Sequence, residues 1–181
     1  ISKLAPDGSV WDAGDIKVKE GHPDNVCRVF ADNQQLWVLG FESTEVWVNT
    51  GALFPFERMN NAVFSIGCSD PYSVAGVAGY RFWRWGASVY GAYGINPERI
   101  SDYGIEQALR SYGDTRDAEG WCYTAGGHIF YVLSIPAAGK TWVFDLKEKA
   151  WHERGYWNTR TGQYDVYRGR VYAQAFGLDL V

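Results

Sequence analysis

The stretch Gly120–Gly155 (GWCYTAGGHIFYVLSIPAAGKTWVFDLKEKAWHERG) carries the clearest fold signal in the sequence. It contains four short runs rich in aromatic and β-branched residues, separated by glycine, proline or charged residues. Such runs favour β-strands, and a pair such as Gly126-Gly127 is typical of a tight hairpin turn. The stretch therefore predicts a four-stranded antiparallel unit. Its strands are expected at Trp121–Thr124, His128–Leu133, Thr141–Asp145 and Ala150–Arg154.

The last turn of this unit reads Asp145-Leu-Lys-Glu-Lys-Ala-Trp151. An aspartate carboxylate can accept hydrogen bonds from backbone N–H groups two residues further on and so hold a turn. Trp151 then begins the outermost strand, where we expect its large ring to pack against the neighbouring unit. This Asp-x5-Trp arrangement therefore supports the fold and says little about chemistry.

Similar runs recur along the chain at nearly constant intervals. Measured at the second strand of each unit, the spacings from Trp37 to Phe82, to Phe130 and to Val171 are 45, 48 and 41 residues. Four-stranded units repeating every 40–50 residues or so are typical of β-propeller blades. The second strands are expected at Gln35–Phe41, Tyr80–Trp85, His128–Leu133 and Arg170–Ala175, after turns at Asp32-Asn33, Ala78-Gly79, Gly126-Gly127 and Arg168-Gly169. Further strands are expected at Val26–Ala31, Thr44–Val48, Ser73–Val77 and Ser88–Tyr93.

The fold class that this repeat predicts is all-β: a partial β-propeller of about three to four antiparallel blades. Its units are expected near 26–60, 61–118, 119–157 and 158–181, the last of them incomplete. Because a closed propeller needs about four to eight blades, we expect residues 1–181 to be a single propeller segment of a longer chain.

One segment departs from the strand pattern. In Ser101–Tyr112, the apolar residues Ile105 and Leu109 lie four apart, which predicts a short helical insertion. Its expected supports are Ser101 or Asp102 as the first cap, Gly113 at its end, and an ion pair between Glu106 and Arg110. The surrounding Pro97–Gly120 carries six acids and three bases, and we expect an exposed excursion there.

Composition excludes several classes of protein. Hydrophobic residues make up 46% and charged residues 21%, which is typical of a globular chain. The formal net charge of −4 argues against a protein that works by clamping phosphates. No run approaches the roughly 20 apolar residues of a membrane span, and no export signal is recognised. The widely spaced Cys27, Cys68 and Cys122 predict free thiols in a reducing compartment.

Several features resemble chemical sites, and we interpret each of them as structural. Ala137–Thr141 resembles the end of a phosphate-binding loop, but it lies between two strands and predicts a hairpin turn. His152 can be a proton shuttle or a polar residue at a strand edge, and we favour the second interpretation. The histidines His22, His128 and His152 share no metal-type spacing with each other or with the cysteines.

Three larger groups of residues leave alternatives open. The six acids can include a glycosidase pair or be surface and turn carboxylates: Asp114, Asp117, Glu119, Asp145, Glu148 and Glu153. The aromatic cluster can stack on sugar or fill the core: Trp83, Trp85, Tyr90 and Tyr93. Lys140–Arg170 has seven Lys/Arg and four Asp/Glu, a local excess that can meet an acidic partner or be incidental. No catalytic, cofactor-binding or metal-binding residue is assigned, and no cofactor or enzymatic activity is expected.

A series of short motifs, taken in order, resembles a known family. The motifs are Thr44–Trp47, Thr50-Gly51, Phe54–Arg58, Gly67-Cys68, Tyr72–Ala75, Asn96–Ser101, Ile105-Glu106, Gly127-His128, Phe130–Leu133, Thr141-Trp142, Asp145 and Trp151–Arg154. Together they resemble the packaged-DNA stabilisation proteins of short-tailed bacteriophages, which form the tail hub or nozzle below the portal. The resemblance extends over approximately residues 25–175. This chain is much shorter than a member of that family.

The resemblance implies a structural protein of the virion tail, made in the host cytoplasm before assembly. Such a protein closes the portal channel as a hexameric ring and contacts the tail adaptor, the tail needle and the tailspikes. It implies no sequence-specific nucleic acid, membrane anchor or catalytic residue. An acidic chain also suits a conduit through which DNA must slide, because like charges repel the phosphate backbone. The alternative is a carbohydrate-binding or glycan-cleaving β-propeller, which predicts two or more rings aligned on an open face beside a carboxylate.

Overall fold

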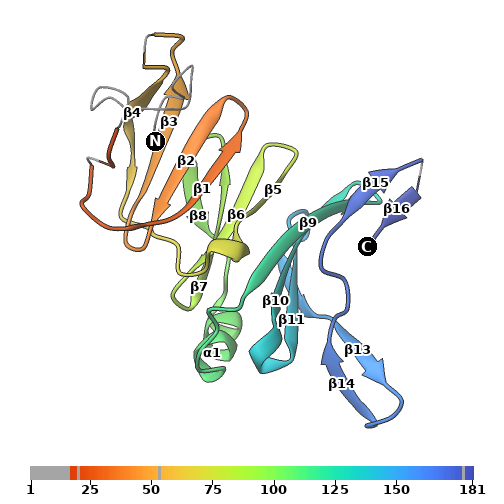
Figure 1. The fold of residues 1–181 in the computed structure, drawn as a ribbon. Coiled ribbons are helices and arrows are strands. Elements are labelled where there is room, and N and C mark those ends of the chain that lie inside the picture. Colours follow the sequence, from red (N-terminus) through yellow and green to blue (C-terminus); the bar gives the residue numbers. More distant parts are fainter. Residues whose placement is uncertain (1–16, 20, 53, 177) are drawn as a thin grey trace, which may run out of the picture. The chain divides into compact units, whose positions relative to one another are not determined.

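The protein is described here from a computed structural model covering residues 17–19, 21–52, 54–176 and 178–181 (Figure 1). The chain divides into two compact units, Ile1–Cys68 (unit 1) and Ser69–Val181 (unit 2). Both are built of antiparallel sheets in which each strand pairs with the next along the chain. Within the described ranges, no helix has the length and hydropathy needed to cross a membrane.

Unit 1 contains one four-stranded sheet in the order of the sequence. Its central strand β2 buries Trp37, Val38 and Leu39, and β3 buries Val46 and Trp47. The three strands predicted in this unit are confirmed, whereas the fourth strand was not singled out by its sequence pattern. The strands are β1 (Val26–Asp32), β2 (Gln35–Gly40), β3 (Thr44–Asn49) and β4 (Phe56–Phe64).

The first hairpin turn of unit 1 lies one residue later than predicted. Asp32 still pairs with Gln35 in the ladder, so the two turn residues are Asn33 and Gln34. Their φ angles are 49° and 61°, as a type I′ turn requires. Asparagine tolerates this backbone conformation better than most residues, which places Asn33 at the first turn position and not at the second.

Unit 2 begins with a second four-stranded sheet. Its hairpin turn at Ala78-Gly79 has positive φ at both residues and was correctly predicted. A short 3-10 helix, η2 (Pro71–Ser73), precedes the sheet. The strands are β5 (Ala75–Val77), β6 (Tyr80–Trp85), β7 (Ser88–Tyr93) and β8 (Asn96–Arg99), and the predicted bounds of β6 and β7 are those observed.

The third sheet forms from the stretch that gave the strongest sequence signal. All four of its predicted strands are confirmed, as is the turn at Gly126-Gly127, whose φ angles are 57° and 78°. The strands are β9 (Glu119–Ala125), β10 (His128–Ile135), β11 (Lys140–Asp145) and β12 (Ala150–Glu153). A 3-10 turn, η3 (Pro136–Ala138), joins β10 to β11.

An α-helix, α1 (Tyr103–Ser111), lies between the second and third sheets in the sequence. The Asp102 carboxylate caps it by accepting a 2.9 Å hydrogen bond from the backbone N–H of Ile105. The expectation of an exposed excursion over Pro97–Gly120 is wrong for much of that segment. Its first residues belong to β8, and the apolar stripe of the helix, Ile105 and Leu109, is buried in the core together with Ala118.

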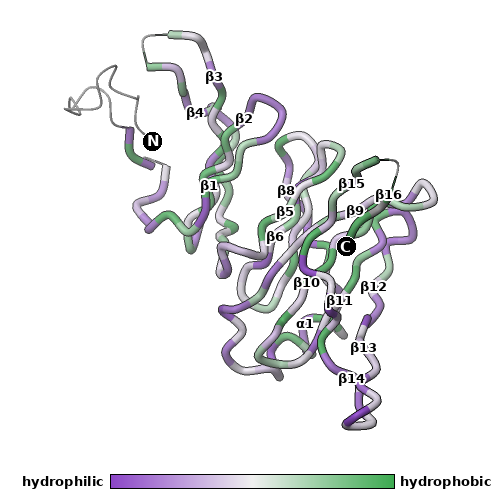
Figure 2. The backbone as a smooth tube through the Cα atoms, turned by 45° about the vertical axis from the view of Figure 1, so that its right-hand side comes forward, coloured by the Kyte–Doolittle hydropathy of each residue, from purple (hydrophilic) through white to green (hydrophobic). Residues whose placement is uncertain are grey.

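Two hairpins complete unit 2, and they correct another prediction. No turn at Arg168-Gly169 joins paired strands: β13 (Gly155–Asn158) pairs with β14 (Gln163–Val166), and β15 (Ala173–Ala175) pairs with β16 (Leu178–Leu180). The strand predicted over Arg170–Ala175 is therefore reduced to its last three residues. The loop between β13 and β14 is hydrophilic, whereas β15–β16 is largely hydrophobic (Figure 2).

Candidate functional site

The two four-stranded sheets of unit 2 pack face to face through aromatic side chains. Phe82 on β6 stacks on Tyr131 of β10 with their ring centroids 5.1 Å apart, and it meets Phe144 of β11 edge-on at 6.5 Å. Alternate residues of β10 (Tyr131, Leu133 and Ile135) enter this cluster, as the two-residue period of a strand requires. The buried residues of both sheets form one cluster, which is the main apolar core among the described residues of unit 2. Burying each large side chain stabilises the fold by about 1.5–3 kcal/mol.

Directional hydrogen bonds also connect these two sheets. The buried Tyr131 hydroxyl donates to the backbone carbonyl of Ser73 at 2.7 Å. The Trp151 indole donates to the backbone carbonyl of Ile100 at 2.9 Å. The prediction that Trp151 packs against the neighbouring unit is therefore confirmed. Ring packing tolerates sliding, but these two bonds hold only in one alignment of the sheets.

Gly120 allows β9 to approach the segment before β5. A Cβ atom at this position would overlap the carbonyl oxygen of Ser73 and lie 2.9 Å from the ring of Tyr131. Any side chain larger than hydrogen would therefore push the two sheets apart. Glycine at the start of the third sheet is thus a requirement of the interface.

A buried ion pair lies beside this close approach. The Arg84 guanidinium donates to the Asp70 carboxylate, and both groups are almost fully removed from solvent. The Ser73 hydroxyl donates to the Asp70 carbonyl at 2.8 Å and accepts from the Arg84 backbone N–H at 3.1 Å. Burial raises the pKa of Asp70 above its ordinary value, although the positive charge of Arg84 opposes that shift. The pair fixes η2 against β6.

Glu106 of α1 anchors the helix to the sheet before it. Its carboxylate accepts 2.9 Å hydrogen bonds from the hydroxyls of Ser88 and Ser101, and it lies 3.3 Å from Arg110 and 3.6 Å from Arg99. Burial alone would raise the pKa of Glu106, but these hydroxyls and arginines outweigh it, so the pKa falls below its ordinary value. The predicted Glu106–Arg110 pair is confirmed.

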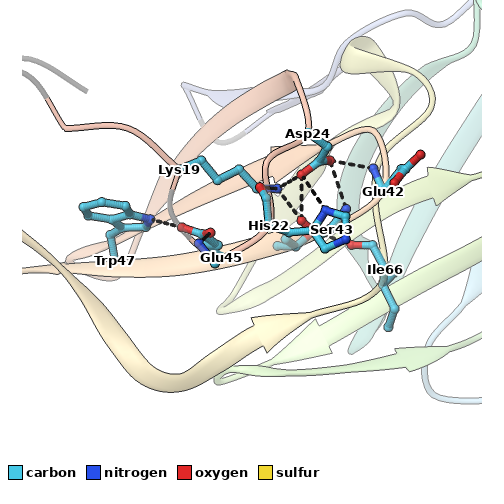
Figure 3. Close-up of polar contacts among 10 residues, drawn as sticks. Lys19, His22, Asp24, Glu42, Ser43, Glu45, Trp47 and Ile66 are labelled. Atoms are coloured by element: carbon cyan, nitrogen blue, oxygen red, sulfur yellow. Dashed lines mark hydrogen bonds and ion pairs between the residues drawn. The ribbon is translucent and has the colours of Figure 1, made fainter.

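In unit 1, the carboxylate of Asp24 is the centre of a polar network (Figure 3). It accepts hydrogen bonds from the backbone N–H of Glu42 at 2.7 Å and of Ser43 at 3.1 Å, and from the Ser43 hydroxyl at 2.8 Å. Lys19 binds both Asp24 and the Ser43 hydroxyl. Burial would raise the pKa of Asp24, but these donors hold it well below its usual range. The network ties the segment before β1 to the loop between β2 and β3.

A second buried carboxylate in unit 1 is likewise fully engaged. Glu45 of β3 accepts a 2.6 Å hydrogen bond from the backbone N–H of Gly21 and a 3.1 Å bond from the Trp47 indole. Figure 3 shows the contact between Glu45 and the Trp47 indole. Because its lone pairs are used by neighbours of the same unit, Glu45 has the features of a structural group.

His128 and Asp145 form a pair that the sequence reasoning missed. The His128 Nδ1 atom lies 2.7 Å from an Asp145 carboxylate oxygen, while the other oxygen accepts from the backbone N–H groups of Lys147 at 2.9 Å and Glu148 at 3.3 Å. The predicted turn-holding role of Asp145 is confirmed. Burial would raise the pKa of Asp145, but His128 and these N–H groups lower it. No sequence motif signals the histidine, because the cross-strand register brings it there.

The six candidate acids are distributed over separate contacts. Five of them have a named partner, and each partner lies on a different element or turn. The partners are Arg116 for Asp114, the Ala137 backbone N–H for Asp117, Arg170 for Glu119, His128 for Asp145, and Lys140 for Glu153. Glu148 is exposed in the turn after β11. These contacts favour the interpretation as turn and surface carboxylates.

The remaining candidate groups are also accounted for locally. The Ala137–Thr141 segment is the turn between β10 and β11 and its Gly139 has a φ of 65°, so the hairpin prediction is confirmed. His152 is exposed on β12, where partial desolvation and nearby Arg154 lower its pKa and keep the ring neutral at neutral pH. Within the described part of the chain, no three His, Cys, Asp or Glu side chains gather as a metal site.

The aromatic cluster is divided between core and surface. Trp83 is completely buried and stacks on Tyr90 at 6.1 Å, whereas Tyr93 is 67% exposed. Tyr93 instead lies 4.7 Å from Tyr80, measured between ring centroids. The core interpretation is therefore correct for Trp83 and wrong for Tyr93, because β7 places Tyr90 and Tyr93 on opposite faces of the sheet.

Two of the seven basic residues in Lys140–Arg170 lie over aromatic rings. Arg154 lies over Tyr123 and Tyr167 at 5.6 and 5.5 Å, and it donates to the Tyr123 hydroxyl at 2.8 Å. Arg168 lies 3.5 Å from the centroid of the Tyr156 ring. All three cysteines are free thiols, and burial raises the pKa of Cys122, which keeps it protonated.

Sheets of four consecutive antiparallel strands, packed through aromatic rings and tied by hydrogen bonds, define a β-protein with propeller-type blades. A family model described as bacteriophage P22 Gp10, β-propeller, matches residues 2–177. The chain belongs to this phage stabilisation family, a family of structural tail components that stabilise packaged DNA and are not enzymes. The predicted family and β-propeller fold are thereby confirmed. A comparison with curated proteins gives no match.

Proposed function

We propose that this chain contributes stacked blades to a tail hub that closes the portal channel beneath the packaged genome. The observation that carries the proposal is the interface between the two sheets of unit 2, where Phe82, Tyr131 and Phe144 pack as a continuous core. Such a wedge-to-wedge interface resists deformation because close-packed interiors are stiff. A rigid wall suits a plug that must hold DNA in place.

In this proposal the protein assembles as a hexameric ring and contacts the tail adaptor, the tail needle and the tailspikes. The sheets β1–β4, β5–β8 and β9–β12 are successive blades, and the hairpins that begin with β13 start a further one. Exposed apolar residues of the last hairpin support the final point, since they suit a strand that packs in a larger sheet. They are Phe176, Leu178, Leu180 and Val181.

The test is complementation of a phage whose own copy of this gene is deleted. Supplying the wild-type protein is expected to restore particles whose DNA is protected from nuclease, and particles made without it are expected to lose their DNA. If the wild-type protein neither joins tails nor protects DNA, the proposed function is wrong.

A pair of variants connects this test to the interface. Tyr131→Ala is expected to reduce DNA retention because it removes both the ring contact and the bond to Ser73. Tyr103→Ala, which alters a tyrosine that is 75% exposed on α1, is the matched control and is expected to retain DNA. Electron micrographs of the restored tails test the hexameric ring. Six-fold symmetry is expected, and any other symmetry rules the ring out.

A further inference from the structure

A groove of about 400 Å³ opens in unit 2 between the sheet β5–β8 and the turn that follows β11. This volume is within the range of about 300–1,000 Å³ that is usual for small-ligand sites. The residues that give it chemical character are Tyr80, Tyr93, Asn96, Glu98, Leu146 and Lys149. Phe82 and Ile100 also line the groove, but none of those six side chains makes the Phe82–Tyr131 contact or the two hydrogen bonds that align the sheets.

One wall of the groove is an aromatic platform fixed to the core. Tyr93 is two-thirds exposed, yet its ring lies 4.7 Å from that of Tyr80. The Tyr80 ring in turn stacks on Phe82 at 6.3 Å, and Phe82 is completely buried. A ring that is held on one side and open on the other presents a preorganised surface for stacking.

The backbone that carries these two tyrosines is fixed from the opposite face. The buried Arg81 side chain donates to the carbonyl of Gly94 at 2.9 Å and to that of Gly79 at 3.4 Å. These glycines lie in the two hairpin turns next to Tyr93 and Tyr80. Arg81 thus holds the two turns together, which limits the ordering cost of a ligand that contacts both rings.

The strand register places polar groups on the same face as the rings. Tyr93 pairs with Asn96, and Gly91 pairs with Glu98, so both polar side chains extend from β8 beside the platform. Gly91 has no side chain to fill the space between Phe82 and Glu98. Lys149 reaches the groove from the turn before β12. An amide, a carboxylate and an amine therefore surround an aromatic surface.

This combination matches the chemistry of a sugar ring. The apolar face of a saccharide stacks on an aromatic ring, while its hydroxyls donate to a carboxylate and accept from an amine or an amide. A phosphate-rich ligand fits poorly, because it needs a basic footprint and the groove has one acid against one base. We propose that this groove binds a short neutral saccharide, with Tyr93 as the stacking platform and Glu98 as the principal hydroxyl acceptor.

The site binds and does not cleave. Glycoside hydrolysis generally requires a pair of carboxyl groups across the scissile bond, and Glu98 is the only carboxylate among the described residues that line the groove. The arrangement fits the binding part of the carbohydrate alternative, with rings beside a carboxylate on an open face. It goes beyond the proposed role in the tail hub, and the groups proposed to contact the saccharide, Tyr93, Glu98 and Lys149, do not make the bonds that align the two sheets.

The test is calorimetric titration of the full chain with maltotriose, cellotriose and triacetylchitotriose at millimolar concentrations, with adenosine monophosphate as an anionic stacking probe. Wild type is expected to bind at least one of the trisaccharides. Tyr93→Ala is expected to weaken that binding at least about tenfold, whereas Tyr93→Phe retains most of it. Glu98→Gln is expected to weaken it about threefold to tenfold.

The matched control is Tyr103→Ala, which removes a comparably exposed tyrosine of unit 2 that does not line the groove. It is expected to bind as wild type does, and thermal unfolding shows whether each variant is folded. Three results overturn the proposal: no trisaccharide binds, only the nucleotide binds, or the Tyr93 and Tyr103 variants lose binding equally.

Discussion

The indole nitrogen of Trp151 donates a 2.9 Å hydrogen bond to the backbone carbonyl of Ile100. Trp151 is the second residue of the outermost strand β12, whereas Ile100 directly follows β8, the last strand of the preceding sheet. The same side chain packs on Phe144 with the ring centroids 5.1 Å apart. Phe144 lies on β11 of the same sheet, so Trp151 combines a ring contact within its own sheet with a directional bond to the preceding sheet.

Replacing Trp151 with phenylalanine separates these two contributions. The ring contact is largely kept, but the donor to Ile100 is lost and the carbonyl is left without it. We expect a loss of about 1–2 kcal/mol in the free energy of unfolding, measured by urea denaturation. Trp157→Phe on the half-exposed hairpin strand β13 is the control and should change stability little. Equal effects of the two substitutions would contradict this role.

Gly120→Ala tests the close approach between β9 and Ser73. The added methyl group overlaps the Ser73 carbonyl, so we expect destabilisation of about 1–3 kcal/mol. Gly104→Ala provides the comparison, because a Cβ there meets only an Asp102 carboxylate oxygen at 3.3 Å and alanine favours the helix. The first variant should melt at a lower temperature than wild type and the second should not. A Gly120 variant as stable as wild type disproves the steric requirement.

Asp102→Ala removes the cap of α1. The backbone N–H of Ile105 loses its acceptor, and we expect a cost of about 1 kcal/mol in the free energy of unfolding. Asp102→Asn retains an acceptor at the same place and should lie close to wild type. Chemical denaturation of the three proteins measures the difference, and a similar loss in both variants indicates that charge and not capping is responsible.

Asp145 makes stability depend on pH in the acid range. Its folded pKa is below the ordinary value of 3.8, so the ionised form stabilises the fold above that value, and the stabilisation is lost as the pH falls through the folded pKa. We expect Asp145→Asn to be less stable than wild type at neutral pH and the gap to narrow below pH 3.8. In proteins that also carry His128→Gln, the loss of stability caused by Asp145→Asn should be smaller at neutral pH. A difference that stays constant with pH would falsify the linkage.

Much of the sheet structure follows from local pattern. Strands β6 and β7 have their predicted bounds because the runs YRFWRW and SVYGAY are bounded by turns whose glycines take positive φ. The prediction of a hairpin turn at Arg168-Gly169 was wrong, because residue types alone do not decide which strands pair. The cross-strand contact of Trp157 with Tyr164, at 5.0 Å, pairs β13 with β14 and leaves the Arg168 segment outside the hairpin.

Side-chain sites were harder to predict than strands. Asp145 holds its turn by bonds to residues at most three positions away, so this role was predictable from the sequence. Its contact with His128 spans 17 residues and depends on the register between β10 and β11. The exposure of Tyr93 beside Glu98 was missed for the same reason. Residue type indicated an aromatic cluster, but only the alternation of β7 and its pairing with β8 decide which ring faces the groove.

The bond from the Tyr131 hydroxyl to the Ser73 carbonyl has a geometric consequence. In any closed circle of wedges, a small angular error at one joint is added to the errors of all the others, and the last joint must absorb their sum. Aromatic stacking alone permits such drift, since its energy changes little over small displacements. A hydroxyl with a single acceptor narrows the range of angles at its own joint, and so limits the error that this joint passes on to the others.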